Sequence, residues 1–210
     1  MLGIASSGPH STGFSLIRKV IPNLNEDFGG MPIGHVLLEP TRLYVKPVLE
    51  LMNEVEIHGM ANITGGGFYE NIPRMFCYPA APDSKSTYLS AVIKDPLKPG
   101  YDGGWKVPPI FARIAYGAKY GGAKHCGVKD AGIGLSGAAA QNAGEEILRS
   151  DPEVRKTMFN TYNMGIGFVM ALAPSDVQKA IAFLEQKGFP AWEIGWVEKP
   201  TSAAGDLRFV

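Results

Sequence analysis

A run of glycines between an apolar segment and a predicted helix is the feature of this sequence best suited to chemistry. Residues 60–71 are MANITGGGFYEN, so Thr64 and three consecutive glycines, Gly65, Gly66 and Gly67, precede a helix-like segment at 68–74. Glycine permits positive φ and a close approach of the backbone to a ligand. Free N–H groups at the start of a helix suit a phosphate or carboxylate. The alternative is an ordinary tight turn, since the run fits neither of the common glycine-rich nucleotide motifs.

A second polar cluster, Ser6, Ser7, His10 and Ser11, lies in a loop that enters a predicted helix. The serine hydroxyls either cap this helix and satisfy backbone groups of the loop or also contact a ligand. His10 is either an exposed histidine or a substrate contact.

Two further polar residues each have two interpretations. Arg42 could bind a phosphate through two hydrogen bonds, or it could form an ion pair with Glu39 or another acid. Asn71 follows Gly67 by about one helical turn and could turn back toward the glycine loop, or it could be a surface residue. The other histidines have no metal-ligand spacing, so no metal site is predicted. No Ser-His-Asp or Cys-His arrangement can be completed.

The composition is ordinary for a globular protein. With 210 residues, 45% apolar and 19% charged, the chain is long enough for one domain with a sizeable core. Lys+Arg and Asp+Glu balance at 20 each, which argues against nucleic acid as the main partner. No apolar run has the length of a membrane span. The cysteines Cys77 and Cys126 form no C-x-x-C pair, and we expect reduced thiols in a cytoplasmic protein.

Strands and helices are predicted to interleave. We expect strands at 2–5, 57–63, 87–93, 164–173, 191–197 and 207–210. We expect helices at 14–20, with Ser11 or Thr12 as N-cap, and at 44–55, 68–74, 108–119, 145–162 and 174–187. The helix at 145–162 should break near Asp151 and Pro152. Residues 23–32, 78–86 and 95–104 are predicted loops, and 117–144 is either a loop or a weak helix. The fold class is therefore α/β or α+β, with a mixed β-sheet covered by helices.

Several segments, in the same order, resemble one family. Residues 5–16 (ASSGPHSTGFSL) are similar to its A-S-S-G-x-H-S-N-G-[YF]-S-L motif, and residues 38–45 (LEPTRLYV) to its L-x-E-P-T-R-I-Y-V segment. Residues 60–67 are similar to M-A-H-I-T-G-G-G. Phe159 with 163–167 echoes F-N-M-G-I-G, and Trp105 with 108–111 matches W-x-x-P-P-I-F. The family is aminoimidazole ribonucleotide synthetase, the cyclo-ligase of purine biosynthesis, and the resemblance covers only its C-terminal half.

The resemblance implies the fold of that C-terminal domain and a set of partners. Residues 1–210 would form one substrate-side domain with an enlarged segment at about 77–162. The N-terminal ATP-binding domain would be absent, so the chain would be an excised domain or the product of a split gene. That missing half would bind most of the ATP and Mg²⁺, and the complete enzyme would be a homodimer.

The resemblance also implies a reaction. The cyclo-ligase closes the imidazole ring of formylglycinamidine ribonucleotide with ATP, giving aminoimidazole ribonucleotide, ADP and phosphate. The serine and His10 loop, Arg42, the loop 64–67 and Asn71 would contact the substrate, and the isolated chain would be inactive.

Two departures from the family pattern leave other functions open. Asn62 stands where the family has His before the glycine run, and Thr12 stands where it has Asn. Loss of an imidazole removes a group that titrates near neutrality. One alternative is therefore a non-catalytic binding or assembly module. Another is a domain of a different ATP-using enzyme of the superfamily, such as a thiamine-phosphate or selenophosphate enzyme.

Overall fold

The computed structural model describes residues 1–76, 89–120, 135–199 and 207–210, which form two sheets and eight α-helices. The larger sheet has the order β2-β4-β1-β5, from strands β1 (Leu2–Ala5), β2 (Ile57–Asn62), β4 (Ile166–Leu172) and β5 (Ala191–Glu193). All its pairs are antiparallel. The smaller sheet has the order β6-β3-β7. Here β3 (Ser90–Ile93) pairs antiparallel with β6 (Gly195–Glu198) and parallel with β7 (Leu207–Phe209).

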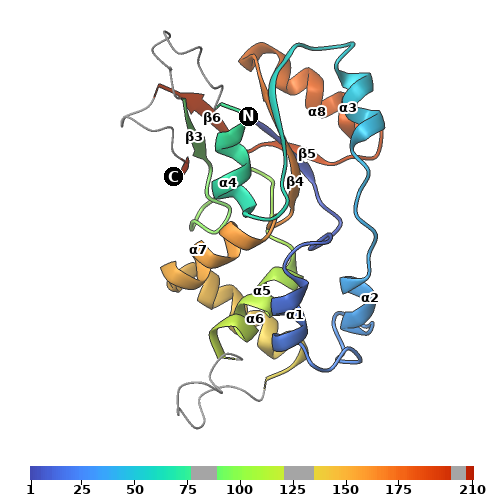
Figure 1. The fold of residues 1–210 in the computed structure, drawn as a ribbon, viewed down its shortest axis with the longest axis vertical. Helices are drawn as coiled ribbons and strands as arrows, with labels where there is room; N and C mark the ends of the chain where they lie inside the picture. The colour runs from blue at the N-terminus through green and yellow to red at the C-terminus, as the bar shows by residue number, and fades with distance from the viewer. Residues whose placement is uncertain (77–88, 121–134, 200–206) are drawn as a thin grey trace.

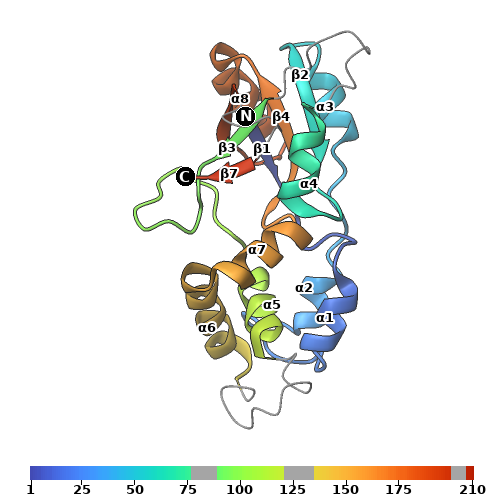
Figure 2. The ribbon, with the colours of Figure 1, turned by 60° about the vertical axis from the view of Figure 1, so that its left-hand side comes forward.

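The helices divide between two ends of the molecule. Figure 1 shows both sheets at one end with α3 (Val45–Leu51), α4 (Gly67–Arg74) and α8 (Val177–Gln186). The other end holds α1 (Phe14–Val20), α2 (Ile33–Leu37), α5 (Pro109–Tyr120) and α6 (Gly137–Ser150). Helix α7 (Pro152–Thr161) lies between the two groups in both views (Figures 1 and 2). This α+β arrangement confirms the predicted fold class.

The buried strand β4 organises the core. Its seven residues are almost all buried, as the continuous apolar run predicted for a strand covered on both faces. One cluster, which includes Phe68, Trp105 and Phe159, fills the space between α4, α5 and α7. A second cluster packs Leu2 and Ile4 of β1 against α3 and α8.

Several predicted boundaries were wrong, each for a tertiary reason. The single strand predicted at 191–197 divides after Glu193, because the chain leaves the larger sheet at the buried Ile194 and enters the smaller one. Gly195 permits this crossing, since a Cβ there would lie 1.9 Å from the Val92 carbonyl oxygen. Helix α3 ends at Leu51 rather than residue 55, and a turn follows.

Other elements were missed or fall only partly within the description. The five-residue helix α2 is too short to show a periodic pattern. The weak helix considered at 117–144 is present from Gly137 onward as α6, whereas 121–134 lie outside the described residues. So do the predicted loop 78–86, the first residues of the strand 87–93, and both cysteines.

Candidate functional site

Two loops that carry the predicted site residues leave the larger sheet at the same edge. Strands β1 and β2 lie on opposite sides of β4 and are both antiparallel to it, so their C-terminal ends point the same way. Ser6 N–H donates to Gly165 O, and Ile63 N–H donates to Gly167 O, each at 2.9 Å. With one strand between them, the loops start about 10 Å apart.

Asn163 joins the first of these loops to the start of β4. Its side chain accepts from Ser6 Oγ at 2.8 Å, and its amide donates to Gly8 O at 2.8 Å. The same Oδ1 accepts from Gly165 N–H at 3.0 Å, and the residue is 2% exposed. Asn163 was not among the predicted site residues, although it opens the segment 163–167 that the motif comparison identified.

His10 is held as a neutral imidazole that can donate from Nδ1. Ser7 N–H donates to His10 Nε2 at 3.2 Å, so the neutral ring carries its proton on Nδ1. Burial, and secondarily the charge of Arg42, hold the His10 pKa below its usual value. The ring packs beside Gly167, where an added Cβ would lie 2.7 Å from His10 Cε1.

A pocket of about 410 Å³ opens in front of this loop. It is lined by Ser6, Ser7, Gly8, Phe28, Val36, Glu39, Arg42, Pro108, Pro109 and Ile110. Ser7 Oγ donates to Pro40 O at 2.6 Å, which fixes the segment that carries Arg42. Arg42 Nη1 donates to Gly188 O at 3.2 Å, and the guanidinium lies 5.4 Å from the Phe189 ring. Arg42 and Glu39 thus both face the pocket, and no ion pair between them is found.

A buried ion pair positions two walls of this pocket. Arg113 Nε and Nη2 donate to the two Glu26 carboxylate oxygens at 2.8 and 2.9 Å, with both side chains 6% exposed. The hydrogen bond from Arg113 holds the Glu26 pKa below its usual value. Glu26 lies two residues before Phe28, and Arg113 is on α5, whose first residues line the pocket.

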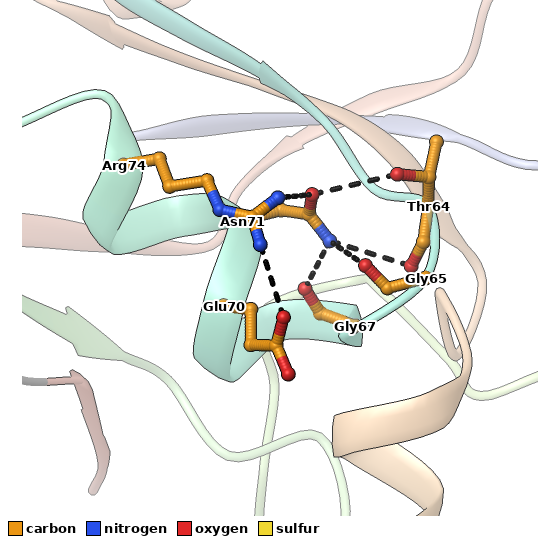
Figure 3. A network of polar contacts seen from close by, with 6 residues as sticks. All are labelled: Thr64, Gly65, Gly67, Glu70, Asn71 and Arg74. Atoms are coloured by element: carbon orange, nitrogen blue, oxygen red, sulfur yellow. Dashed lines mark hydrogen bonds and ion pairs between the residues drawn. The ribbon is translucent and has the colours of Figure 1, made fainter.

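The glycine loop lies on the other side of β4 and is held by Asn71 (Figure 3). The Asn71 amide donates to the carbonyls of Gly67 at 2.8 Å, Gly65 at 3.2 Å and Thr64 at 3.3 Å. Asn71 is 6% exposed, so it is not a surface residue. It turns back onto the loop, as the first of its two interpretations predicted. The loop carbonyls point inward to this amide, while Thr64 and Gly65 are exposed.

The fold explains why glycine is needed at two of the three positions in this run. Gly66 and Gly67 have φ of 90° and 53°, which favour glycine. A Cβ on Gly67 would also lie 2.1 Å from the Phe159 carbonyl oxygen of α7. Gly65 has neither a positive φ nor any atom within 4 Å of an added Cβ. The fold therefore does not require glycine at position 65. The absence of a Cβ there leaves the backbone accessible to a ligand.

The Glu70 carboxylate lies beside the start of α4, where the sequence analysis expected a site for an anion. A Cβ on Gly66 would lie 2.5 Å from Glu70 Oε2, and that carboxylate is paired with Arg74 at 3.0 Å. A negative charge is favourable at a helix N-terminus. An incoming anion at this helix end would therefore meet the Glu70 carboxylate, whose charge is partly offset by Arg74.

The structure brings only some of the predicted residues together. Ser6, Ser7 and Arg42 line the pocket, and His10 contacts Ser7 behind it. Thr64, the three glycines and Asn71 form a separate group across β4 and do not line it. Ser11 is exposed, and neither it nor Thr12 caps α1, which was a wrong alternative. Gly13 is the N-cap instead, with φ 74° and the Tyr162 hydroxyl donating to its carbonyl at 3.0 Å.

The sequence interpretation missed the remaining pocket residues. Gly8, Phe28, Val36 and residues 108–110 at the beginning of α5 come from segments far apart in the chain. Only Glu39 was considered, as a partner of Arg42. A larger hollow of about 660 Å³, between residues 96–107 and helices α5 and α6, contains none of the predicted site residues. In the described part of the chain, no group of three or more acidic, histidine or cysteine residues could hold a metal ion. No helix of that part is long and apolar enough to cross a membrane.

Comparison with known proteins shows the family to which this chain belongs. The family model described as AIR synthase related protein, C-terminal domain, matches residues 1–77 and 116–207. The chain therefore belongs to that family. Residues 78–115 lie outside the match and within the segment 77–162 that the sequence analysis described as enlarged.

The relatives that match over nearly the whole chain are phosphoribosylformylglycinamidine cyclo-ligases. The proteins of Clostridium novyi (strain NT) and Clostridium acetobutylicum are each 40% identical over 198 residues, which is 94% of this chain and 45% of the relative. The protein of Clostridium botulinum (strain 657) is 38% identical over 199 residues, which is 95% of this chain and 45% of the relative. The chain thus spans about 45% of the length of these relatives.

Proposed function

We propose that this chain is the substrate-side domain of an ATP-dependent cyclo-ligase that closes the imidazole ring of formylglycinamidine ribonucleotide. The observation that carries the proposal is the pocket in which Ser6, Ser7, Glu39 and Arg42 meet at the edge of the larger sheet. The substrate has a phosphate on one side of its ribose, and an amidine followed by the formyl group on the other. A guanidinium and a carboxylate in one pocket complement both groups. The names of the relatives support the same function.

Each group of the chain has a binding or orienting role in this proposal. Arg42 keeps N–H groups for the substrate phosphate beyond the one given to Gly188. Glu39 accepts from the amidine nitrogens. His10 donates through Nδ1 and does not act as a base, because its Nε2 lone pair already accepts from Ser7 N–H. The Glu26–Arg113 pair keeps the pocket walls in place.

The chemistry consists of two displacements. The formyl oxygen takes the γ-phosphoryl group of ATP, and ADP leaves. The amidine nitrogen then attacks the activated carbon, loses a proton, and phosphate leaves with the former formyl oxygen. Such a reaction depends on positioning and on stabilisation of charge more than on a protein nucleophile. The exposed loop residues Thr64 and Gly65 fit a role beside the transferred phosphoryl group.

In this proposal ATP and Mg²⁺ are bound mainly by the part of the cyclo-ligase that this chain does not span. The described residues do not fit a metal site, so no step is assigned to a metal ion held by this chain. The 210 residues form a single domain that works with the ATP-binding half, as a homodimer when complete, in the cytoplasm. The chain alone is expected to be inactive.

The test measures binding and turnover separately. Calorimetry should show that the purified chain binds formylglycinamidine ribonucleotide. Arg42→Met should weaken binding about ten- to a hundredfold, the range for a lost hydrogen bond to a charged group. Arg18→Met, which changes an exposed arginine on α1, should have no effect. ATP-dependent formation of aminoimidazole ribonucleotide should appear only when the unmatched part of the C. novyi relative is added.

Two results would contradict the proposal. Robust turnover by the chain alone would show that the ATP-binding half is not needed. Substrate binding without any turnover after addition of that half, at saturating ATP and Mg²⁺, would instead favour the non-catalytic binding module.

A further inference from the structure

Helix α3 has one broad apolar face, and only part of that face is covered. Val48 and Leu51 are buried, 5% and 0% exposed, in the cluster that includes Ala180 and Leu184 of α8. Val45, Leu49 and Met52, spaced four and three residues apart, are 70%, 58% and 49% exposed. This spacing places the three on one helix face. A helix whose apolar side chains extend around more than half of its circumference is normally buried over that whole surface.

The uncovered part of this face continues along the chain segment that precedes α3. Leu38 and Leu43 are 76% and 79% exposed. We define the apolar stripe as Leu38, Leu43, Val45, Leu49 and Met52. These five residues are half of the ten exposed large hydrophobic residues in the described part of the chain. Figure 1 shows that the backbone carrying them runs along one side of the molecule, from the end of α2 to α3. Large exposed apolar side chains that follow one another along a surface can mark an interaction site.

Neighbouring charges do not cover the stripe. Glu50 pairs with Lys187 at 2.6 Å, so its carboxylate is directed toward the end of α8. Lys46 approaches Glu50 only to 4.0 Å, and its side chain is 87% exposed. The face therefore presents an apolar strip with a lysine at its edge, which is the usual composition of an interface core and rim.

We propose that the apolar stripe is the docking surface for the part of the cyclo-ligase that this chain does not span. The relatives are more than twice as long as the region they share with this chain, so a large partner segment exists in each of them. The stripe also adjoins the pocket. Two pocket residues, Glu39 and Arg42, lie between Leu38 and Leu43 in the sequence. A partner seated on the stripe reaches the pocket mouth, where the second substrate must arrive. This inference rests on the proposed function for the identity of the partner.

The experiment measures association of the 210-residue chain with the separately purified, unmatched part of the C. novyi relative. The test variant is Val45→Glu with Leu49→Glu, and the control is Trp196→Glu, which changes an apolar residue 42% exposed on β6 of the other sheet. Sedimentation velocity and calorimetry should show an affinity at least tenfold lower for the stripe variant and unchanged for the control. Circular dichroism should show both variants folded, because the replaced side chains are exposed.

The outcomes separate the docking surface from the function itself. Equal affinity for the stripe variant and the unmodified chain, or no association of the unmodified chain, would overturn the proposal. A dimer of the chain alone that the stripe variant dissociates, with partner binding unaffected, would assign the stripe to a second copy and also overturn it. Binding of formylglycinamidine ribonucleotide to the chain alone is measured in parallel. Stripe-dependent association without substrate binding would refute the proposed function while supporting the docking surface.

Discussion

At the scale of single residues, identical glycines in one run have different roles. Gly67 is required by the backbone of α7, whose Phe159 carbonyl would lie 2.1 Å from an added Cβ. Gly66 is required by its φ of 90°. Gly65 meets neither constraint, so its place in the run is best explained by a ligand that approaches the backbone. We therefore propose that Gly67 serves the fold and Gly65 serves ligand binding.

We predict that Gly65→Ala and Gly67→Ala will have opposite effects. Gly65→Ala should leave the free energy of unfolding unchanged or slightly raised, because Ala restricts the unfolded chain. It should weaken ATP or substrate binding in the reconstituted enzyme. Gly67→Ala should lower the free energy of unfolding by about 1–3 kcal/mol, the usual cost of overpacking. Urea unfolding measures the free energy of unfolding, and calorimetry measures the ligand affinity. Full activity of Gly65→Ala would contradict a ligand contact at this position.

A second residue-scale prediction concerns His10 and pH. Its pKa is lowered in the folded chain, so below about pH 6.5, the unperturbed value, the unfolded chain binds a proton that the folded chain resists. Stability should therefore fall as the pH decreases from 7.5 to 5.5. His10→Asn should reduce this acid-dependent loss, because Asn cannot titrate there and tolerates the positive φ of 58°. Urea midpoints at both pH values test this, and an equal acid loss in both proteins would contradict it.

At the scale of elements, helix α4 holds its own entrance loop through one side chain. Asn71 lies in the second turn of α4, and its amide reaches back to three carbonyls of the loop. The amide thus replaces hydrogen bonds that no neighbouring strand supplies. The network in Figure 3 continues outward to Arg74 and Glu70, which are exposed. Rigidity of the loop should depend on the buried amide and little on the outer ion pair.

We predict that Asn71→Ala will lower the free energy of unfolding by about 1–3 kcal/mol, because the loop loses the three hydrogen bonds of this buried amide. Arg74→Ala, which removes an exposed helical ion pair, should change it by less than about 0.5 kcal/mol. Urea unfolding compares the variants, and hydrogen exchange of residues 64–68 should accelerate only in Asn71→Ala. A larger loss of unfolding free energy in Arg74→Ala than in Asn71→Ala would contradict this assignment, because it would show that the outer ion pair supports the loop.

At the scale of the whole molecule, residues 89–115, which lie outside the family match, are part of the core. They contribute β3, the central strand of the smaller sheet, and the fully buried Trp105. The Trp105 ring is stacked on Phe68, with centroids 5.5 Å apart, and its Nε1 donates to Met164 O at 3.1 Å. The segment therefore ties α4 to the start of β4, where both site loops leave the sheet.

We predict that Trp105→Ala will lower the free energy of unfolding by about 3–5 kcal/mol, the usual cost of truncating a buried aromatic residue. Trp105→Phe should cost less, since it keeps the stacking and loses the hydrogen bond. Trp196→Ala, at a side chain 42% exposed, should cost less than about 0.5 kcal/mol. Urea unfolding followed by circular dichroism provides the comparison. Near-native stability of Trp105→Ala would show that this segment is peripheral to the fold.

The amino-acid sequence by itself determined the features that depend on neighbouring residues. Periodicity located α1, α8 and the buried strand β4, and the run 64–67 predicted a turn that enters a helix. The order of motifs also indicated the family that the comparison confirmed. These signals are local because side-chain direction repeats along a helix or strand, so a short window contains them.

Only the tertiary structure decided which distant segments meet and why particular residues are needed. It placed Glu39 and Phe28 in one pocket with Ser6, separated the glycine loop from that pocket by β4, and left part of the apolar face of α3 uncovered. It also divided the last predicted strand between two sheets at Ile194. Such outcomes depend on packing between residues far apart in the chain, and a local pattern of residue types does not contain that information.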